Sequence, residues 1–185
     1  MYNKDTTEKK IIKKCKKVLT KLFFYDIIII ENKERGNEKM TKAIYFDMDG
    51  TIADLYAVEN WLDDLINYRP RPYQIATPLV RMTSLAKVLN RLQRNGYSIG
   101  IVSWLSKSGT EQYNAEVTKA KKKWLQTHLK SVHFNEIHIV PYGTPKEKVV
   151  FQPNGILFDD EENNRKNWCG TAYDVNNIIE ILKAL

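Results

Sequence analysis

From Met40 onward, the chain alternates between short apolar runs and longer stretches in which apolar residues recur every three or four positions. Short, continuous apolar runs bounded by polar residues are typical of strands buried on both faces of a sheet. The runs that we interpret as strands are Ala43 to Phe46, Ser98 to Ser103, Glu136 to Val140 and Gly155 to Phe158, with a further short strand near Thr171 to Tyr173.

The stretches with helical periodicity predict five helices, and local signals mark their ends. These helices run from Asp54 to Tyr68, Leu79 to Gln93, Thr110 to Leu129, Thr144 to Val150 and Asp174 to Leu185. In the first, the predicted core face comprises Leu55, Val58, Trp61, Leu62, Leu65 and Ile66. The run Arg69-Pro70-Arg71-Pro72 breaks this helix, and Asn95-Gly96 ends the second.

This alternation of strands and helices predicts the fold class. It indicates an α/β domain with a doubly wound parallel sheet covered by helices on both faces. The connections between parallel strands are right-handed in such folds. Ligands bind at the carboxyl ends of the strands, near the point where the strand order reverses, so the chemistry is expected there.

Residues 1–39 differ from the remainder, residues 40–185. They are rich in lysine, then apolar from Ile27 to Ile30, then charged again. With 11 Lys and Arg against 6 Asp and Glu, they carry +5 of the net charge of +7. We expect either that Met40 is the true start and these residues are not native, or that they form a loosely attached, disordered extension. The alternative is a basic amphipathic helix that binds a partner or a membrane surface.

The remaining composition excludes several classes of protein. Residues 40–185 are almost balanced in charge, so a basic face for nucleic acid is not indicated. No apolar stretch is long enough to span a bilayer. Cys15 and Cys169 cannot form a disulfide framework, which favours free thiols and a cytoplasmic protein. The three histidines lack metal-ligand spacing, and Lys119 with Lys121 to Lys123 is expected to be a solvated helix face.

Polar residues of a particular kind follow the predicted strands. The first strand leads into Asp47-Met48-Asp49-Gly50-Thr51, the second ends at Ser103, and the fourth leads into Asp159-Asp160. Lys146 and Lys148 lie shortly before the fourth strand. In a parallel sheet the carboxyl ends of the strands meet at one edge, so these side chains are expected to converge.

Transfer of a phosphate ester needs the groups that would converge there. One carboxylate can attack phosphorus, and a second can protonate the leaving alkoxide and then activate water. Mg²⁺ is suited to carboxylate and carbonyl oxygens, and a hydroxyl and an ammonium can hold the phosphoryl oxygens. Gly50 permits an unusual turn whose backbone N–H groups can face phosphate.

The ordered set of motifs resembles the haloacid dehalogenase (HAD) superfamily of phosphatases over roughly residues 42 to 183. The resemblance implies that Asp47 is the nucleophile and Asp49 the general acid and base. It implies that Mg²⁺ is held by Asp47, the backbone carbonyl of Asp49, and the pair Asp159-Asp160. The residues expected to bind substrate phosphate are Gly50, Thr51, Ser103, Trp104 and Lys146, with Lys148 as the alternative lysine. Asn163 and Asn164 either support the metal site or cap a turn.

Only about 50 residues separate Thr51 from Ser103, so the cap that often selects the substrate in this family must be small and helical, spanning about 54–78. The residues expected to line the cleft are Asp54, Tyr56, Trp61, Arg69, Arg71, Tyr73 and Trp104. We therefore predict a Mg²⁺-dependent phosphomonoester hydrolase acting on a small phosphorylated metabolite or nucleotide, similar to deoxyribonucleotidase-like and phage-borne members. The alternatives are a phosphatase acting on nucleic-acid ends and a non-catalytic binding module.

Overall fold

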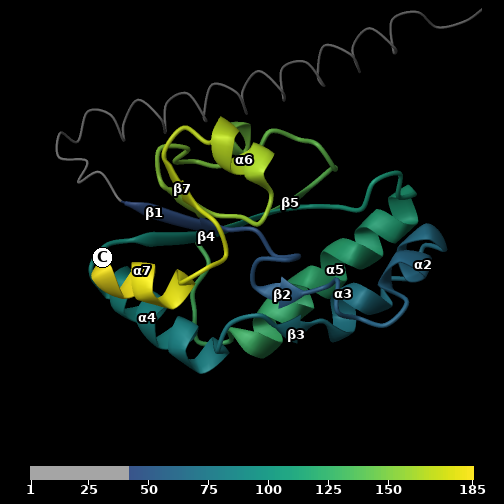
Figure 1. Ribbon diagram of the computed structural model, residues 1–185, viewed down its shortest axis with the longest axis horizontal. Helices are drawn as coiled ribbons and strands as arrows, with labels where there is room; N and C mark the ends of the chain where they lie inside the picture. The colour runs from purple at the N-terminus through teal and green to yellow at the C-terminus, as the bar shows by residue number, and fades with distance from the viewer. Residues whose placement is uncertain (1–41) are drawn as a thin grey trace, which may run out of the picture. The chain divides into compact units, whose positions relative to one another are not determined.

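The computed structural model describes residues 42–185, so the interpretation of residues 1–39 as an extension lies outside the described part of the chain. Five parallel strands form its central sheet (Figure 1). They are β1 (Ala43–Phe46), β4 (Ser98–Trp104), β5 (Glu136–Val140), β6 (Ile156–Phe158) and β7 (Thr171–Tyr173). All five predicted strands are confirmed, and the domain has the expected α/β, Rossmann-like architecture with helices on both faces.

The strand order β5-β4-β1-β6-β7 determines where a ligand can approach the sheet. From β1 the chain passes to β4 and β5 on one side, then returns to β6 and β7 on the other side. The order therefore reverses between β1 and β6, where Phe46 is paired with Phe158. Crevices for ligands open at the carboxyl ends of the strands at such a reversal. Here the residues that follow β1 and β6 are Asp47 and Asp159.

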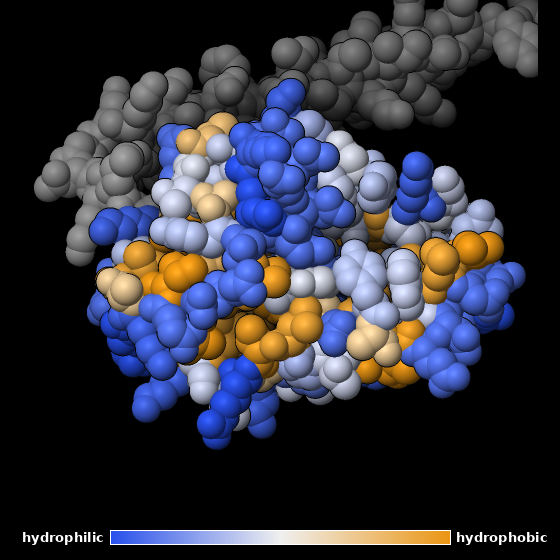
Figure 2. Space-filling view, viewed as in Figure 1, coloured by the Kyte–Doolittle hydropathy of each residue, from blue (hydrophilic) through white to orange (hydrophobic). Residues whose placement is uncertain are grey.

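Helices cover the two faces unequally. The main core lies between one face of the sheet and α4 (Met82–Arg94), α5 (Glu111–His128) and α7 (Ile178–Ala184). The other face has a smaller apolar cluster that includes Tyr45 and Trp168. On that face lies α6 (Glu162–Asn167), which was not predicted because its sequence ENNRKN has no apolar periodicity. Figure 2 shows a hydrophilic surface over it.

The segment between β1 and α4 differs from its prediction. A short antiparallel ribbon of β2 (Ala53–Asp54) and β3 (Thr77–Pro78) encloses two short helices, α2 (Trp61–Ile66) and α3 (Arg71–Ile75). The single helix predicted from Asp54 to Tyr68 is therefore wrong. Its core face is confirmed only in part, because Leu55 is buried whereas Leu62 and Ile66 are exposed. The reason is local: Asn60 adopts a left-handed conformation with φ of 58°, which prevents a continuous helix.

The run Arg69-Pro70-Arg71-Pro72 does more than break a helix. Pro72 lies in the first turn of α3, where the lack of an N–H costs nothing. The Nε atoms of Arg69 and Arg71 both donate to the buried carboxylate of Asp64, each over 2.6 Å. These guanidinium groups therefore join α2 to α3, and the prediction that they line a cleft is wrong.

Two further predictions change in detail. The helix predicted from Thr144 to Val150 is only a single 3-10 turn, η1 (Lys146–Lys148), because Lys146 turns inward and Val150 packs into the core beside Tyr45. The last helix begins at Ile178, after Asn177 in a left-handed conformation. Within residues 42–185, no helix combines the length and the hydrophobicity needed to cross a bilayer.

Candidate active site

Three carboxylates meet where the strand order reverses. Asp47 directly follows β1, and its backbone N–H donates to Phe158 O over 2.9 Å. Asp159 directly follows β6 and is completely buried, and Asp160 comes next. One carboxylate oxygen from each of Asp47, Asp159 and Asp160 lies within 4.8 Å of the other two. The predicted convergence of the first and fourth strand ends is thus present in the structure.

A buried lysine lies between these carboxylates. Lys146 Nζ is 2.9 Å from Asp47 Oδ1 and 2.6 Å from Asp159 Oδ2. Burial alone would lower the pKa of Lys146, but the charges of Asp47 and Asp159 outweigh it and raise this pKa. Lys146 is therefore held as an ammonium. The alternative lysine, Lys148, is exposed on the same 3-10 turn and does not meet the carboxylates.

The polar helix α6 holds the acidic pair in place. Asn164 Nδ2 lies 3.2 Å from both carboxylate oxygens of Asp159, and the backbone N–H of Glu161 donates to Asp159 Oδ1 over 2.9 Å. Arg165 Nη1 donates to the backbone carbonyls of Asp159 and Asp160, each over 2.7 Å. Of the two interpretations of Asn164, the structure places it in support of the acidic pair.

Burying the three carboxylates close together raises the pKa values of Asp159 and Asp160. Burial raises the pKa of Asp159, and the charge of Asp47 raises it further. Burial and the charge of Asp47 likewise raise the pKa of Asp160 to about 6. Three neighbouring carboxylates share one ammonium, so the group retains excess negative charge when all three are ionised.

The turn after β1 shapes the site around Asp160. Met48 O accepts hydrogen bonds from the backbone N–H groups of Thr51 and of the two residues after it. Thr51 Oγ1 donates to Asp160 Oδ1 over 3.0 Å and accepts from Asp160 N over 3.1 Å. Gly50 has a φ of 75°, and a Cβ atom there would lie 2.4 Å from Asp160 Oδ2. Gly50 and Thr51 are therefore required by the position of Asp160.

We predict that Gly50→Ala destabilises the protein by about 2–4 kcal/mol, since a side chain at positive φ is strained and Asp160 must also leave its bond to Thr51. Gly96→Ala is the matched control, because Gly96 has a φ of 87° but no neighbouring atom within 4 Å of an added Cβ. It should cost only about 1–2 kcal/mol of backbone strain. Urea unfolding measures both, and equal losses would contradict the close approach of Asp160.

Lys121 is the site residue that the sequence reasoning missed. Its side chain is 1% exposed, so the prediction that it belongs to a solvated face is wrong. Its Nζ donates to Asp49 Oδ2 over 2.7 Å, to Ser103 Oγ over 2.9 Å and to Trp104 O over 2.6 Å. Helical spacing contained the signal, because Lys121 lies midway between the apolar residues Val117 and Leu125, which are both buried.

A cleft of about 270 Å³ opens above Asp47, Asp49, Asp160 and Lys146. Its walls are aromatic, formed by Tyr56, Trp61, Tyr73, Trp104 and Tyr142. Trp104 is held by a hydrogen bond from its Nε1 to Thr144 O over 2.8 Å, and its ring centroid lies 5.0 Å from that of Tyr142. Asp54 does not line this cleft. Ser103 is fully buried behind it, against Lys121.

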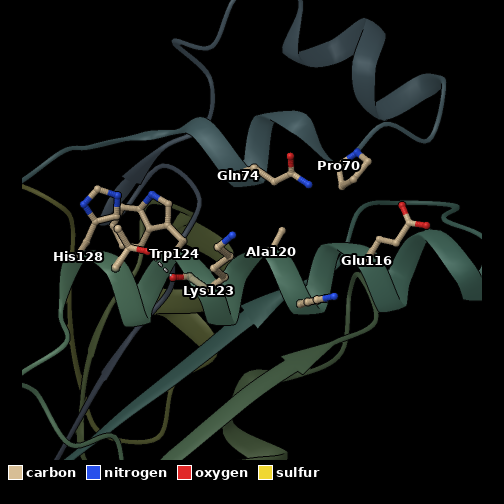
Figure 3. A pocket seen from close by; sticks show the side chains of 9 residues that line it. Pro70, Gln74, Glu116, Ala120, Lys123, Trp124 and His128 are labelled. Atoms are coloured by element: carbon tan, nitrogen blue, oxygen red, sulfur yellow. Dashed lines mark hydrogen bonds between the residues drawn. The ribbon is translucent and has the colours of Figure 1, made fainter.

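A larger groove, of about 460 Å³, lies between α3 and α5 and contains none of these groups. Figure 3 shows Gln74 on the α3 side opposite Ala120 and Trp124 on α5. Its single carboxylate is Glu116, so the groove offers no pair of carboxylates. Helix α5 thus directs the buried Lys121 toward Asp49, which lines the cleft, and presents a different set of residues to the groove. The chemistry is concentrated in the smaller cleft.

The carboxylate group fits a hard divalent cation. Among residues 42–185, it is the only set of three or more acidic, histidine or cysteine side chains whose ligand atoms lie this close together. Asp47 Oδ1 is buried and accepts no hydrogen bond, although Lys146 is at ion-pair distance. All the donor atoms are oxygens, which magnesium and calcium prefer over softer ligands.

No protein-family model matches this chain, and neither does any curated protein. Among solved structures, it is similar to D,D-heptose 1,7-bisphosphate phosphatase from Burkholderia thailandensis, with 14% identity over 68% of this chain and 70% of that one and a TM-score of 0.42. It is also similar to the HAD domain of the effector protein Lem4 from Legionella pneumophila, with 15% identity over 72% and 84% of the two chains and a TM-score of 0.35. At such values neither protein transfers an activity to this chain, and the site has to be interpreted from its own residues.

Proposed function

We propose that this protein is a Mg²⁺-dependent phosphomonoester hydrolase of the HAD type, with Asp47 as its nucleophile. One observation carries the proposal: Asp47, the pair Asp159-Asp160 and Lys146 converge at the reversal of strand order, while Asp49 lines the same cleft. A structural role alone would not require three neighbouring carboxylates, since burying them together is costly.

The residues that would hold Mg²⁺ are Asp47, Asp159 and Asp160, with the backbone carbonyl of Asp49. When bound, the ion offsets the negative charge of the carboxylates and of the substrate phosphate. Asn164 and Arg165 fix the orientation of the acidic pair from behind, as outer partners of metal ligands commonly do.

In the first chemical step, a carboxylate oxygen of Asp47 forms a bond to phosphorus as the ester P–O bond breaks. Asp49 gives its proton to the departing alkoxide, which leaves as an alcohol. In the second step, Asp49 takes a proton from water as that water attacks phosphorus. The bond between Asp47 and phosphorus then breaks, which regenerates the Asp47 carboxylate and releases inorganic phosphate.

Lys146, which lines the cleft, is the proposed partner of the phosphoryl oxygens, and Ser103 supports the site from its buried position behind the cleft, where it bonds to Lys121. The Lys146 ammonium lies beside the nucleophile Asp47, where negative charge accumulates during phosphoryl transfer. The exposed Lys148 is not part of this proposal. Gly50 and Thr51 act by shaping the turn and holding Asp160, besides any backbone contact with phosphate.

The cleft favours a small substrate. A volume of about 270 Å³ lies just below the usual range for ligand pockets, which begins near 300 Å³. Its aromatic walls are suited to a planar or apolar group attached to the phosphate. A phosphorylated metabolite or nucleotide fits this cleft better than a nucleic-acid end, because residues 40–185 are almost balanced in charge.

The test is hydrolysis of a panel containing an aryl phosphate, phosphorylated metabolites, nucleotides and 5′- or 3′-phosphorylated oligonucleotides, each with Mg²⁺ or with EDTA. We expect Mg²⁺-dependent release of phosphate from the aryl phosphate and from one or more small substrates. Preference for oligonucleotides, with activity that falls steeply as salt increases, would favour the nucleic-acid alternative. No hydrolysis of any compound would favour a binding module.

A further inference from the structure

Lys121 makes three hydrogen bonds to residues at and behind the cleft, and none of the steps above uses it. Its ammonium bonds to Asp49 Oδ2, Ser103 Oγ and Trp104 O, which matches the three donors that an ammonium has. We propose that Lys121 is a positioning residue that orients the carboxylate of Asp49, the proposed general acid and base. This inference rests on the proposed function, because it concerns the same cleft.

The first reason is the cost of burying this charge. A lysine that is 1% exposed loses nearly all contact with water, and an apolar side chain of similar size would usually stabilise a core as well. The surroundings on α5 are apolar, since Val117, Trp124 and Leu125 are all buried. The charge is therefore placed where its main ionic partner is Asp49, which itself lines the cleft.

The second reason concerns the atoms of Asp49 and Ser103 that the three hydrogen bonds leave available. Lys121 occupies Oδ2 of Asp49, so Oδ1 is the oxygen left to exchange a proton with a group in the cleft. Ser103 Oγ accepts the bond from Lys121, so its own proton is available to donate to another acceptor. One ammonium thus determines which oxygen of Asp49 acts and makes the Ser103 hydroxyl a donor.

The third reason is that Lys121 contacts several structural elements that are far apart along the chain. Its Nζ lies 5.2 Å from the centroid of the Tyr73 ring, which belongs to α3 and to the aromatic wall of the cleft. The ammonium therefore contacts the turn after β1, the end of β4, and α3 at once. These elements are far apart along the chain, and Lys121 holds them in register around the position that a phosphate ester would occupy.

The experiment separates the two chemical steps in Lys121→Met with 2,4-dinitrophenyl phosphate. This leaving group needs no proton, so the first release of dinitrophenolate should stay within about 3-fold of wild type. Hydrolysis of the phosphorylated Asp47 needs Asp49 as base, so steady-state turnover should fall by about 10- to 100-fold, as expected for weakened general-base catalysis. A burst of one equivalent of dinitrophenolate, followed by slow turnover, is the predicted signature. Lys122→Met, at the exposed neighbour on α5, should show neither change.

A double-mutant cycle tests whether Lys121 acts through Asp49. In an Asp49→Asn background, Lys121→Met should change turnover by less than about 2-fold, because two residues that act as one unit are not additive. Lys121→Arg, which keeps the charge, should recover part of the lost turnover. Lys121→Gln serves the same measurements if the Met variant does not fold.

The outcomes separate this inference from the proposed function. An active wild type in which the burst and the turnover fall equally, or in which the two substitutions are additive, overturns the positioning role alone. A wild type that releases no dinitrophenolate with Mg²⁺ overturns the proposed function, and the inference with it.

Discussion

Replacing Asp47 by Asn is expected to lower Mg²⁺-dependent hydrolysis of an aryl phosphate by at least about 10⁴-fold, the scale of effect seen when a nucleophile is removed. An amide has nearly the same shape as the carboxylate but cannot attack phosphorus, and it also removes one proposed ligand of the cation. The variant should still fold, since the amide keeps an acceptor oxygen beside Lys146. Steady-state phosphate release measures the effect.

The matched control is Asp174→Asn. Asp174 directly follows β7, so it lies at the same edge of the sheet, but it is exposed and outside the carboxylate group. Its substitution should leave turnover within about 2-fold, as is usual for surface changes away from a site. Acid quenching of wild type with a ³²P-labelled substrate should trap label on the protein, and Asp47→Asn should trap none. Equal labelling of both proteins would exclude Asp47 as the nucleophile.

The sheet could be predicted from the sequence because its strands are short and buried on both faces. Ala43 to Phe46 is apolar at every position, and each residue is buried in the structure, as expected for a central parallel strand. The same reasoning located the acidic residues, since Asp47 and Asp159 each follow such a strand. A parallel sheet brings Asp47, Asp159 and Asp160 to one edge, as predicted, but their close contact also depends on the pairing of β1 with β6, which the sequence analysis did not predict.

That reasoning missed Lys121 and Arg165, because each is a charged residue whose role depends on a tertiary partner. Lys121 belongs to a run of lysines, and such runs are usually solvated, yet its helical position between Val117 and Leu125 turns it inward. Arg165 lies in a helix with no apolar period, so nothing in the pattern marks it as the donor to the backbone of Asp159.

The insertion between β1 and α4 was misread for a different reason. Its apolar residues do recur at helical spacing, but the left-handed conformation of Asn60 delays the first helix to Trp61, and Tyr68, with a φ of 54°, separates that helix from α3. Asp64 then joins the two short helices through ion pairs with two arginines. Conformations of single residues and pairings of this kind follow from packing in three dimensions. Periodicity cannot report them.

The final expectation concerns Asp160, whose position among like charges makes its effects on stability and on metal binding opposite in sign. Its pKa rises from an ordinary value near 4 to about 6, because of burial and the charge of Asp47. A raised carboxyl pKa means that the ionised form is disfavoured in the folded state, so stability falls as the pH rises through this window. Near pH 7 without a divalent cation, the ionised group therefore costs stability on the order of 1–2 kcal/mol.

Asp160→Asn should thus stabilise the protein by about 1–2 kcal/mol in EDTA at pH 7, because the amide removes the repulsion and still accepts the bond from Thr51. The same variant should need about 100-fold more Mg²⁺ for half-maximal hydrolysis, since it loses one of the three proposed side-chain ligands. Urea unfolding in EDTA and in Mg²⁺, with a Mg²⁺ titration of activity, measures both effects.

The control is Glu162→Gln, at a residue in an exposed ion pair with Lys166. It should change neither the stability in EDTA nor the Mg²⁺ requirement. A variant that is less stable in EDTA and keeps its Mg²⁺ requirement would show that Asp160 is a structural residue. Opposite signs in the two conditions are the mark of a carboxylate whose unfavourable position is relieved by a bound cation.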